Sequence, residues 1–545
     1  MRRLLVCWFW LQLGLWGAEA RQRIWEQARQ NGVRAHEMFA RAQRMLHAWL
    51  RYADPETLLL PDRLPGLIRG QPNAELVYTP HNSGADNYPY LILTAYFTDP
   101  ALYDGRMREM LRNEIRYTCA PGTLIPANLD LRTRQLGPPS WFGAGEYAKD
   151  GLLAVTELLG RTPWYDRMVD LMDEFRRRAP IQTRFGALPD TGAELNGDVM
   201  QVLARLIPMT ADPNFREWAL AIGRAYVEEI LPANGWLPGY RWNFAEKTDA
   251  GYTRLRDHGN EILVGLVLTH AVLADLGEAR AAAWRPALRK MLDRVLASAN
   301  PDGMLYNEVD NRDLKPRGQG LSDNWGYVYG AVYAFYQATG EERYREAVRR
   351  LLRNLPKYRN YDWESGSMDG LADSIEGAVY LVAREPVPEA LDWIESEMQI
   401  LLGYQQPDGT IERWYGDGNW NRTLLLYALM KTQGCFVRGW APGVELGAVR
   451  EGDRLYVTLH ARQDWSGRLQ FDFARHRRVL NLQRNYVRLN EWPEWYAVDE
   501  NTLYRVRNET EKTEQLRLGS ELKEGLPVRV TGGVTVQLVV EPARG

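Results

Sequence analysis

Residues 322–327, Ser-Asp-Asn-Trp-Gly-Tyr, open the stretch that decides the fold. They lead into the run Val328–Ala338, which is apolar on nearly every side, as expected for a helix that is buried all round. Thr339-Gly340-Glu341 follows, with Gly340 as the expected helix terminator. The next segment, Arg343–Leu355, is amphipathic and rich in Arg and Glu. The unit is therefore a buried helix paired with a surface helix.

The same unit recurs at spacings of roughly 50 to 65 residues, within the range of helical repeats. Helices that are apolar all round need neighbours on both sides, so the array is expected to close into a two-layer ring. The predicted fold is mainly α: an α/α toroid of six or seven helical hairpins. Seven polar clusters open the buried helices, at residues 81–87, 143–146, 191–198, 257–261, 322–327, 368–376 and 415–422.

The character of the chain changes at about Trp440. Short stretches with period-two alternation follow, such as Leu455–Leu459 and Val534–Val540, with Gly, Asp and Asn between them. This pattern is typical of a small β-sandwich-like domain. We predict a toroid domain over residues 21–438 and a C-terminal β domain over residues 439–545.

The amino terminus has the pattern of an export signal. Arg2 and Arg3 precede the apolar stretch Leu4–Trp16, and Ala18-Glu19-Ala20 fits a signal-peptidase site. The stretch is shorter than the roughly 20 residues of a membrane-spanning helix. We therefore expect a signal peptide over residues 1–20, a secreted or periplasmic location, and no membrane span after cleavage.

Composition narrows the possible partners. A 45% hydrophobic, 25% charged chain is expected to be globular, and a net charge of −3 with mixed signs argues against nucleic-acid binding. After signal removal, Cys119 and Cys435 remain outside any Cys/His cluster; they either pair or are buried thiols, and no metal or cofactor is implied. The 20 Trp and 28 Tyr residues suit stacking on sugar rings, so the expected partner is a poly- or oligosaccharide.

The polar clusters converge on one mouth of the ring, because all buried helices start at the same end. One oxygen is enough to cap a helix, whereas several clusters carry more polar groups than capping requires. Two reactions fit this excess. Hydrolysis of a glycosidic bond needs an acid and a base, about 6.5 to 9.5 Å apart in an inverting enzyme. Candidates for that pair, left unassigned, are Asp257, Glu261, Asp323, Asp369, Asp373, Glu376 and Asp417.

The second reaction is β-elimination at a uronic acid, in which the sugar carboxylate is neutralised, a base removes a proton and an acid protonates the leaving oxygen. His258 and Tyr327 are the expected proton carriers. The predicted catalytic residues are His258, Tyr327, Glu261, Asp257, Asp323 and Asp373. The predicted substrate-binding residues are Asn196, Asn260, Asn324, Trp325, Arg317, Asp369, Glu376, Trp414, Asp417, Arg422 and His81.

The turn Gly340-Glu341-Glu342-Arg343-Tyr344, the Asp408-Gly409-Thr410 turn ahead of Trp414-Tyr415, and the β module resemble the six-hairpin-glycosidase-like superfamily and α/α-toroid polysaccharide lyases. The resemblance spans about residues 70 to 435 and implies a glycan-cleaving enzyme. Seven-hairpin members that degrade alginate or glucuronan use residue types found here at Asn196, Glu261, His258, Arg317 and Tyr327.

We place β-elimination slightly ahead of inverting hydrolysis, and keep a non-catalytic glycan-binding toroid protein as a further alternative.

Overall fold

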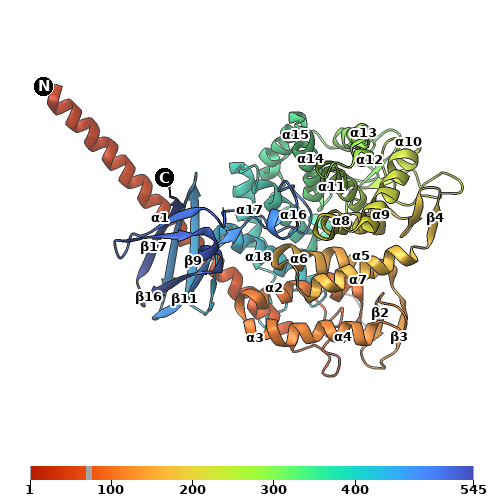
Figure 1. The fold of residues 1–545 in the computed structure, drawn as a ribbon, viewed down its shortest axis with the longest axis horizontal. Helices are drawn as coiled ribbons and strands as arrows, with labels where there is room; N and C mark the ends of the chain where they lie inside the picture. Colours follow the sequence, from red (N-terminus) through yellow and green to blue (C-terminus); the bar gives the residue numbers. More distant parts are fainter. Residues whose placement is uncertain (1, 69–75, 544–545) are drawn as a thin grey trace.

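The computed structural model describes residues 2–68 and 76–543, with side chains from residue 19 onward. A ring of helices forms the larger part of the molecule, and β-sheets lie beside it (Figure 1). Successive inner helices contact each other directly, except that the second contacts the third through the π-helical segment Tyr147–Leu152 that leads into the second. The last inner helix contacts the first, which closes the ring. The predicted α/α toroid is confirmed. Its inner layer in the described residues has seven members: α2 (Tyr88–Thr98), α6 (Leu153–Leu159), α8 (Ala193–Thr210), α11 (Glu261–Asp275), α14 (Trp325–Thr339), α16 (Met368–Val382) and α18 (Asp417–Thr432).

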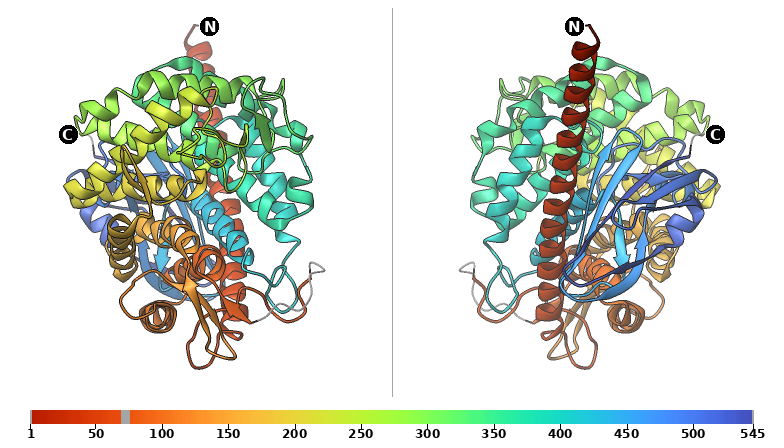
Figure 2. Two further views of the ribbon diagram at one scale, coloured as in Figure 1. Left: turned by 90° about the vertical axis from the view of Figure 1, so that its right-hand side faces the viewer. Right: turned by 90° about the vertical axis from the view of Figure 1, so that its left-hand side faces the viewer.

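The outer helices turn one apolar stripe toward the inner layer and a charged face outward, as amphipathic surface helices do. The outer position next to α18 and α2 is filled by the first helix of the chain, α1, whose other side contacts β9 and β10 of the C-terminal region. Figure 2 shows α1 running along the β-sheets. The outer helices are α1 (Arg2–Leu50), α4 (Arg108–Thr118), α7 (Pro163–Arg178), α9 (Pro213–Arg224), α13 (Arg285–Ala297), α15 (Glu342–Asn354) and α17 (Pro388–Leu402).

Shorter elements complete the ring. The helical ones are η1 (Pro80–Asn87), α3 (Pro100–Leu102), η2 (Tyr103–Met107), α5 (Trp141–Glu146), η3 (Tyr147–Leu152), η4 (Ala225–Ile230), α10 (Leu231–Ala233), α12 (Ala279–Ala282), η5 (Leu355–Tyr358) and η6 (Trp363–Ser365). Strands brace the connections: β1 (Val77–Tyr78), β2 (Ala127–Asp130) and β3 (Leu136–Pro139) form one sheet, while β4 (Ile181–Thr183) pairs with β5 (Gly186–Leu188), and β6 (Tyr252–Arg254) with β7 (Glu308–Asp310).

Two inner helices are entered through π-helical turns. The segment η1 leads into α2, and η3 joins α5 to α6; the two π-helical segments pack against each other. The Thr79 hydroxyl caps η1 by accepting a hydrogen bond from the backbone N–H of Asn82. A π turn changes the direction in which side chains project and is frequent at functional sites. Both segments face the mouth of the ring.

Glycine permits the closest approaches between inner helices. A Cβ on Gly326 of α14 would lie 2.3 Å from the Cα of Gly377 on α16. A Cβ on Gly418 of α18 would lie 1.9 Å from the backbone oxygen of Asp86 in η1. Any larger residue at these positions forces the helices apart, so the glycines set the width of the ring.

The C-terminal region contains two antiparallel sheets around a shared apolar core, which confirms a small β domain after the toroid. One sheet has the order β15-β14-β17-β10-β9 and the other β16-β11-β8; β12 and β13 form a short parallel pair. The strands are β8 (Phe436–Arg438), β9 (Val444–Glu451), β10 (Arg454–Ala461), β11 (Trp465–Gln470), β12 (Asp472–Phe473), β13 (Ala497–Val498), β14 (Leu503–Asn508), β15 (Thr513–Leu518), β16 (Leu526–Val530) and β17 (Thr535–Pro542), with helices α19 (Arg475–Arg478) and α20 (Gly519–Glu524) between them.

The structure also bears on the expected cysteine pairing and on membrane-spanning helices. Cys119 and Cys435 are free thiols, so the alternative in which they pair is wrong. Among the helices of the described residues, none is both long enough and apolar enough to cross a membrane. Residues 2–20 of the predicted signal segment form the first turns of α1, which continues through Ala20 without a break; Met1 lies outside the described residues.

Candidate active site

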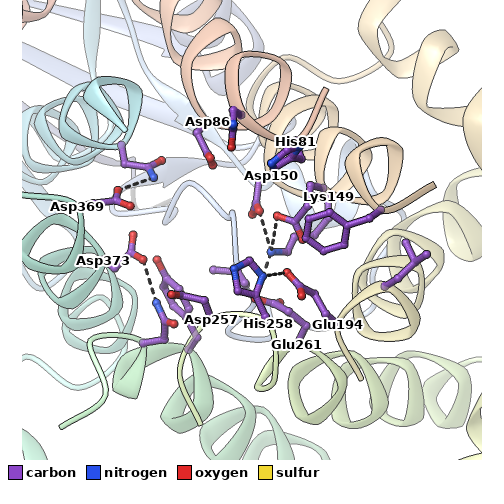
Figure 3. Close-up of a pocket in the computed structure, with 18 of the residues that line it drawn as sticks. His81, Asp86, Lys149, Asp150, Glu194, Asp257, His258, Glu261, Asp369 and Asp373 are labelled. Atoms are coloured by element: carbon purple, nitrogen blue, oxygen red, sulfur yellow. Dashed lines mark hydrogen bonds and ion pairs between the residues drawn. The ribbon is translucent and has the colours of Figure 1, made fainter. Parts of the chain in front are cut away.

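A cavity of about 500 Å³ opens at the mouth of the ring, where the inner helices begin. Figure 3 shows acidic side chains reaching into it from several inner helices. Its carboxyl-bearing lining residues are Asp86, Glu146, Asp150, Asp190, Glu194, Asp257, Glu261, Glu364, Asp369 and Asp373, against the fixed cations Lys149, Arg241 and Arg422. The cavity is therefore strongly acidic.

Asp86 and Asp150 extend from the two adjoining π-helical segments, η1 and η3. Burial and repulsion from Asp150 hold the pKa of Asp86 well above the ordinary value of an aspartic acid. Within the described residues, no hydrogen bond or ion pair engages the Asp86 carboxyl, and its side chain stays partly accessible. The surroundings of Asp86 therefore favour its protonated form more than those of an ordinary aspartic acid, and the carboxyl faces the cavity.

Asp150 has the opposite environment. Burial alone would raise its pKa, but the Lys149 ammonium and hydrogen bonds from Glu146, Lys149 and Asn490 together hold the pKa below its ordinary value. The Lys149 Nζ lies 2.8 Å from one carboxylate oxygen, and the Asn490 amide nitrogen lies 2.9 Å from the other. Asp150 is accordingly an ionised carboxylate with both oxygens fixed.

Lys149 is surrounded by acids. Its ammonium also lies 3.2 Å from Glu261, 3.7 Å from Asp198 and 4.0 Å from Glu146. One buried ammonium cannot neutralise four carboxylates, and burial with mutual repulsion raises the pKa of Glu146, Asp198 and Glu261. The Lys149 ammonium is thus already paired with acids and is not available to an anionic ligand.

The Arg422 guanidinium is likewise paired with acidic side chains, here from α16. Its guanidinium donates to Asp373 at 2.5 Å and pairs with Glu376 at 2.7 Å. The Tyr327 hydroxyl donates to Glu376 at 2.5 Å, and burial keeps the pKa of Tyr327 well above 10. Asn324 donates to the second Asp373 oxygen at 2.9 Å. Burial outweighs Arg422 and raises the pKa of Asp373 to about 7.

His258 lies on the side of the cavity near Lys149, with its backbone at φ +62°. Its Nδ1 hydrogen-bonds the Glu194 carboxylate. Burial lowers the pKa of His258, but the Glu194 hydrogen bond and charge prevail and raise it above 6.5. His81 shares this wall, and burial lowers its pKa. The pKa values of the two histidines are therefore displaced in opposite directions.

Three carboxylates, on Asp257, Asp323 and Glu364, have oxygen atoms within 4.8 Å of one another, the spacing of a metal site. The guanidinium of Arg256 already bridges all three, at 2.7, 3.4 and 2.7 Å. An arginine at the centre of the group supplies the positive charge that a metal ion would bring, so this cluster fits an ion-pair network better than a cation site.

The structure divides the sequence-predicted residues into two sets. Those lining the cavity are His81, Asp257, His258, Glu261, Asn324, Tyr327, Asp369, Asp373, Trp414 and Arg422. Those not lining it are Asn196, Asn260, Arg317, Asp323, Trp325, Glu376 and Asp417.

Most of the second set have structural contacts. Asp417 accepts from the backbone N–H groups of Ile411 and Glu412, and Trp325 donates to Ser374. Asn196 donates to the backbone oxygens of Asp190 and Gly192.

Arg317, in the loop before residue 320, lies over the ring of Tyr252 at 4.5 Å. The Asn260 amide is buried without a hydrogen bond among the described residues. Of the residues whose types match the elimination enzymes, Glu261, His258 and Tyr327 line the cavity, whereas Asn196 and Arg317 do not.

Asp86 and Asp150, and their neighbours Lys149 and Glu194, were not among the residues predicted from the sequence. Asp86 lies inside the cluster at residues 81–87 and Glu194 inside the cluster at residues 191–198, so the sequence offered both as candidates. Lys149 and Asp150 follow the short cluster at residues 143–146, as two charges inside an otherwise apolar helix. A buried Lys-Asp pair in such a helix is the signal that identifies them.

No protein-family model and no curated protein matches the chain. Similar solved structures include the unsaturated glucuronyl hydrolase of Bacillus sp. GL1, with 14% identity over 56% of this chain and 88% of that chain and a TM-score of 0.38. Another is the family 76 glycoside hydrolase (mannosidase) of Bacteroides thetaiotaomicron: 12% identity, 72% and 99% coverage, TM-score 0.41.

A third is the cellobiose 2-epimerase of Bacillus thermoamylovorans: 10% identity, 61% and 89% coverage, TM-score 0.39. All three are six-hairpin glycosidase-like α/α-toroid enzymes, the group that the sequence resembles. With TM-scores below 0.5 they carry no argument about the activity of this chain, and its ring rests on its own helix contacts.

Proposed function

We propose that this protein is a carbohydrate-active enzyme that hydrolyses a glycosidic bond, with Asp86 as general acid and Asp150 as general base or nucleophile. The observation that carries the proposal is a pair of carboxyls that line the cavity from the adjoining segments η1 and η3. Asp150 is held by Lys149 and Asn490, whereas burial and the charge of Asp150 act on Asp86, so their pKa values are displaced in opposite directions. Glycoside hydrolysis requires one protonated and one ionised carboxyl at the scissile bond.

Charge favours hydrolysis over elimination at a uronate. Elimination requires a cation or strong donor to neutralise the sugar carboxylate. In the described part of the chain, each lysine and arginine that lines the cavity is already paired: Lys149 with four acids, Arg422 with Asp373 and Glu376, and Arg241 with Asp190 at 3.5 Å. An anionic sugar entering this cavity would meet ten carboxyl-bearing residues. A neutral or amino glycan suits the site better.

The apolar lining supports a sugar ligand. Phe142, Tyr240, Trp414 and Tyr415 contribute aromatic faces among the acids, the combination that positions pyranose rings. The export signal over residues 1–20 remains our proposal for the location, and a secreted or periplasmic enzyme of this kind would meet glycans outside the cytoplasm.

The experiment is incubation of the purified protein with a panel of neutral, amino and uronic glycans. New reducing ends and the absorbance of unsaturated products are measured in parallel. The proposal expects reducing ends without unsaturation. The same assay is applied to Asp86→Asn, which removes the proposed general acid. Asp104→Asn, at an exposed aspartate on η2, is its matched control. Unsaturated products would establish elimination instead, and binding without cleavage would establish a non-catalytic glycan-binding protein.

A further inference from the structure

A segment of the C-terminal region, residues 484–492, leaves the β domain and crosses the far end of the ring, opposite the mouth. It contacts the last turns of several inner helices. The Tyr486 hydroxyl donates to Asp275 of α11 at 2.7 Å, and Gln337 of α14 donates to the backbone oxygen of Asn485 at 3.0 Å. Trp492 donates to the backbone oxygen of Ala154 in α6 at 2.9 Å. We refer to residues 484–492 as the plug.

Buried ion pairs fix the plug. Arg488 forms a two-bond pair with Glu157 of α6, at 2.8 and 2.9 Å, and both side chains are 1% exposed. Glu157 also accepts from Arg205 of α8 at 2.9 Å, and Arg205 donates to the backbone oxygen of Leu489 at 2.6 Å. Leu489 in turn lines the cavity. The plug therefore supplies part of the floor of the candidate active site.

Asn490 carries the contact to the proposed catalytic pair. Its amide nitrogen donates to Asp150 Oδ1 at 2.9 Å and to the backbone oxygen of Lys149 at 3.0 Å. The residue is buried, and its backbone is left-handed, at φ +64°, a conformation that asparagine tolerates better than most residues. Both amide hydrogens are thus directed at residues 149 and 150.

We infer that Asn490 is a positioning residue for Asp150, so that the C-terminal region completes the active site of the ring. The inference rests on the proposed function. With Lys149 on Oδ2 and Asn490 on Oδ1, the carboxylate cannot rotate, and each donor favours its ionised form. The ring supplies Lys149 and Glu146, and the donor to Oδ1 comes from the plug.

The test is Asn490→Gly, which keeps the left-handed backbone and removes the amide. Asn481→Gly is the matched control: Asn481 is also left-handed, at φ +55°, but is exposed and donates to Pro208 outside the site. We expect kcat/KM to fall about 10- to 100-fold in Asn490→Gly. The acid limb of its pH profile should move up by about one pH unit, because the ionised carboxylate loses a donor. Asn481→Gly should match the wild type.

Asn490→Asp extends the series. It also tolerates the left-handed backbone and places a second carboxylate against Asp150, so its acid limb should move further than that of Asn490→Gly. The other groups facing Asp150 stay constant across the series: Asp86, Tyr90, Glu146, Glu261 and Glu376, besides Lys149. If either variant folds and shows both the acid limb and the kcat/KM of the wild type, the inference is overturned.

Asp150→Asn separates the two proposals. If it abolishes cleavage while Asn490→Gly behaves as wild type, the role of Asn490 alone is wrong. If Asp150→Asn cleaves as the wild type does, the catalytic assignment itself is wrong.

Discussion

At the scale of single residues, the surroundings of Asp86 and Asp150 decide what each does. Asp86 has burial and a neighbouring negative charge, both of which favour the neutral acid. Asp150 has an ammonium and several hydrogen-bond donors, which favour the ion. In the proposed reaction, the same residue type therefore supplies a proton donor and a proton acceptor from two adjoining π-helical segments.

This assignment predicts a bell-shaped dependence of kcat/KM on pH. Activity falls on the acid side as Asp150 becomes protonated, below the ordinary aspartate value near 3.8. It falls on the basic side as Asp86 loses its proton, well above that value. The profile is measured with the best substrate of the panel. A rate that rises from pH 4 through neutrality, as a histidine base with a pKa near 6.5 would give, contradicts the assignment.

The His258–Glu194 pair predicts a pH-dependent stability. The folded-state pKa of His258 is raised, so its contribution is fully present below about pH 6.5 and is lost as pH rises through the folded value. We expect the thermal midpoint of the wild type to exceed that of His258→Asn by more at pH 6 than at pH 8.5. Asparagine accepts the positive φ at this position. Glu194→Gln should reproduce the pattern, and a difference independent of pH contradicts the pair.

At the scale of elements, the pattern of apolar helices and polar openings predicted the ring well, because burial on every side leaves a clear sequence signal. His81, Asp257, His258 and Asp373, which were predicted from the helix openings, line the cavity. Other contacts left no local signal. The place of Asp150 depends on the π-helical segment η3, which the sequence pattern does not indicate.

Glycine spacing between inner helices predicts one sharp mutational effect. Gly418→Ala places a Cβ against the backbone of Asp86, so α18 or η1 must move. We expect a loss of about 1–3 kcal/mol in unfolding free energy and a fall in kcat. Gly105→Ala, whose Cβ meets nothing within 4 Å, is the control and should leave both unchanged. Equal behaviour of the two variants contradicts the close approach.

At the scale of the whole molecule, both ends of the chain contribute to the ring. The first helix, α1, fills an outer position and also contacts β9 and β10, while the plug closes the far end of the ring. Neither role was predicted from the sequence, because each depends on contacts between residues hundreds of positions apart. The C-terminal β domain was predicted as a separate module, yet Leu480, Leu489 and Trp492 belong to the core of the ring.

The ion pairs of the plug predict a large stability effect. Glu157→Gln leaves Arg205 and Arg488 buried with an incomplete partner, and breaking such a pair costs about 3–5 kcal/mol. Glu228→Gln, which loses an exposed pair with Arg224, should change stability by at most about 0.5 kcal/mol. Unfolding midpoints of the two variants are compared at constant pH. Similar midpoints contradict a structural role for the plug.

The most direct test of the central claim is the kcat/KM of Asp86→Asn on two substrates with the same sugar. One has the natural sugar leaving group and the other an acidic phenol, which leaves without a proton. A lost general acid lowers the rate about 10²- to 10⁴-fold on the first and has little effect on the second. We predict this split. Equal losses on both substrates, or wild-type activity on the natural one, would contradict Asp86 as the proton donor.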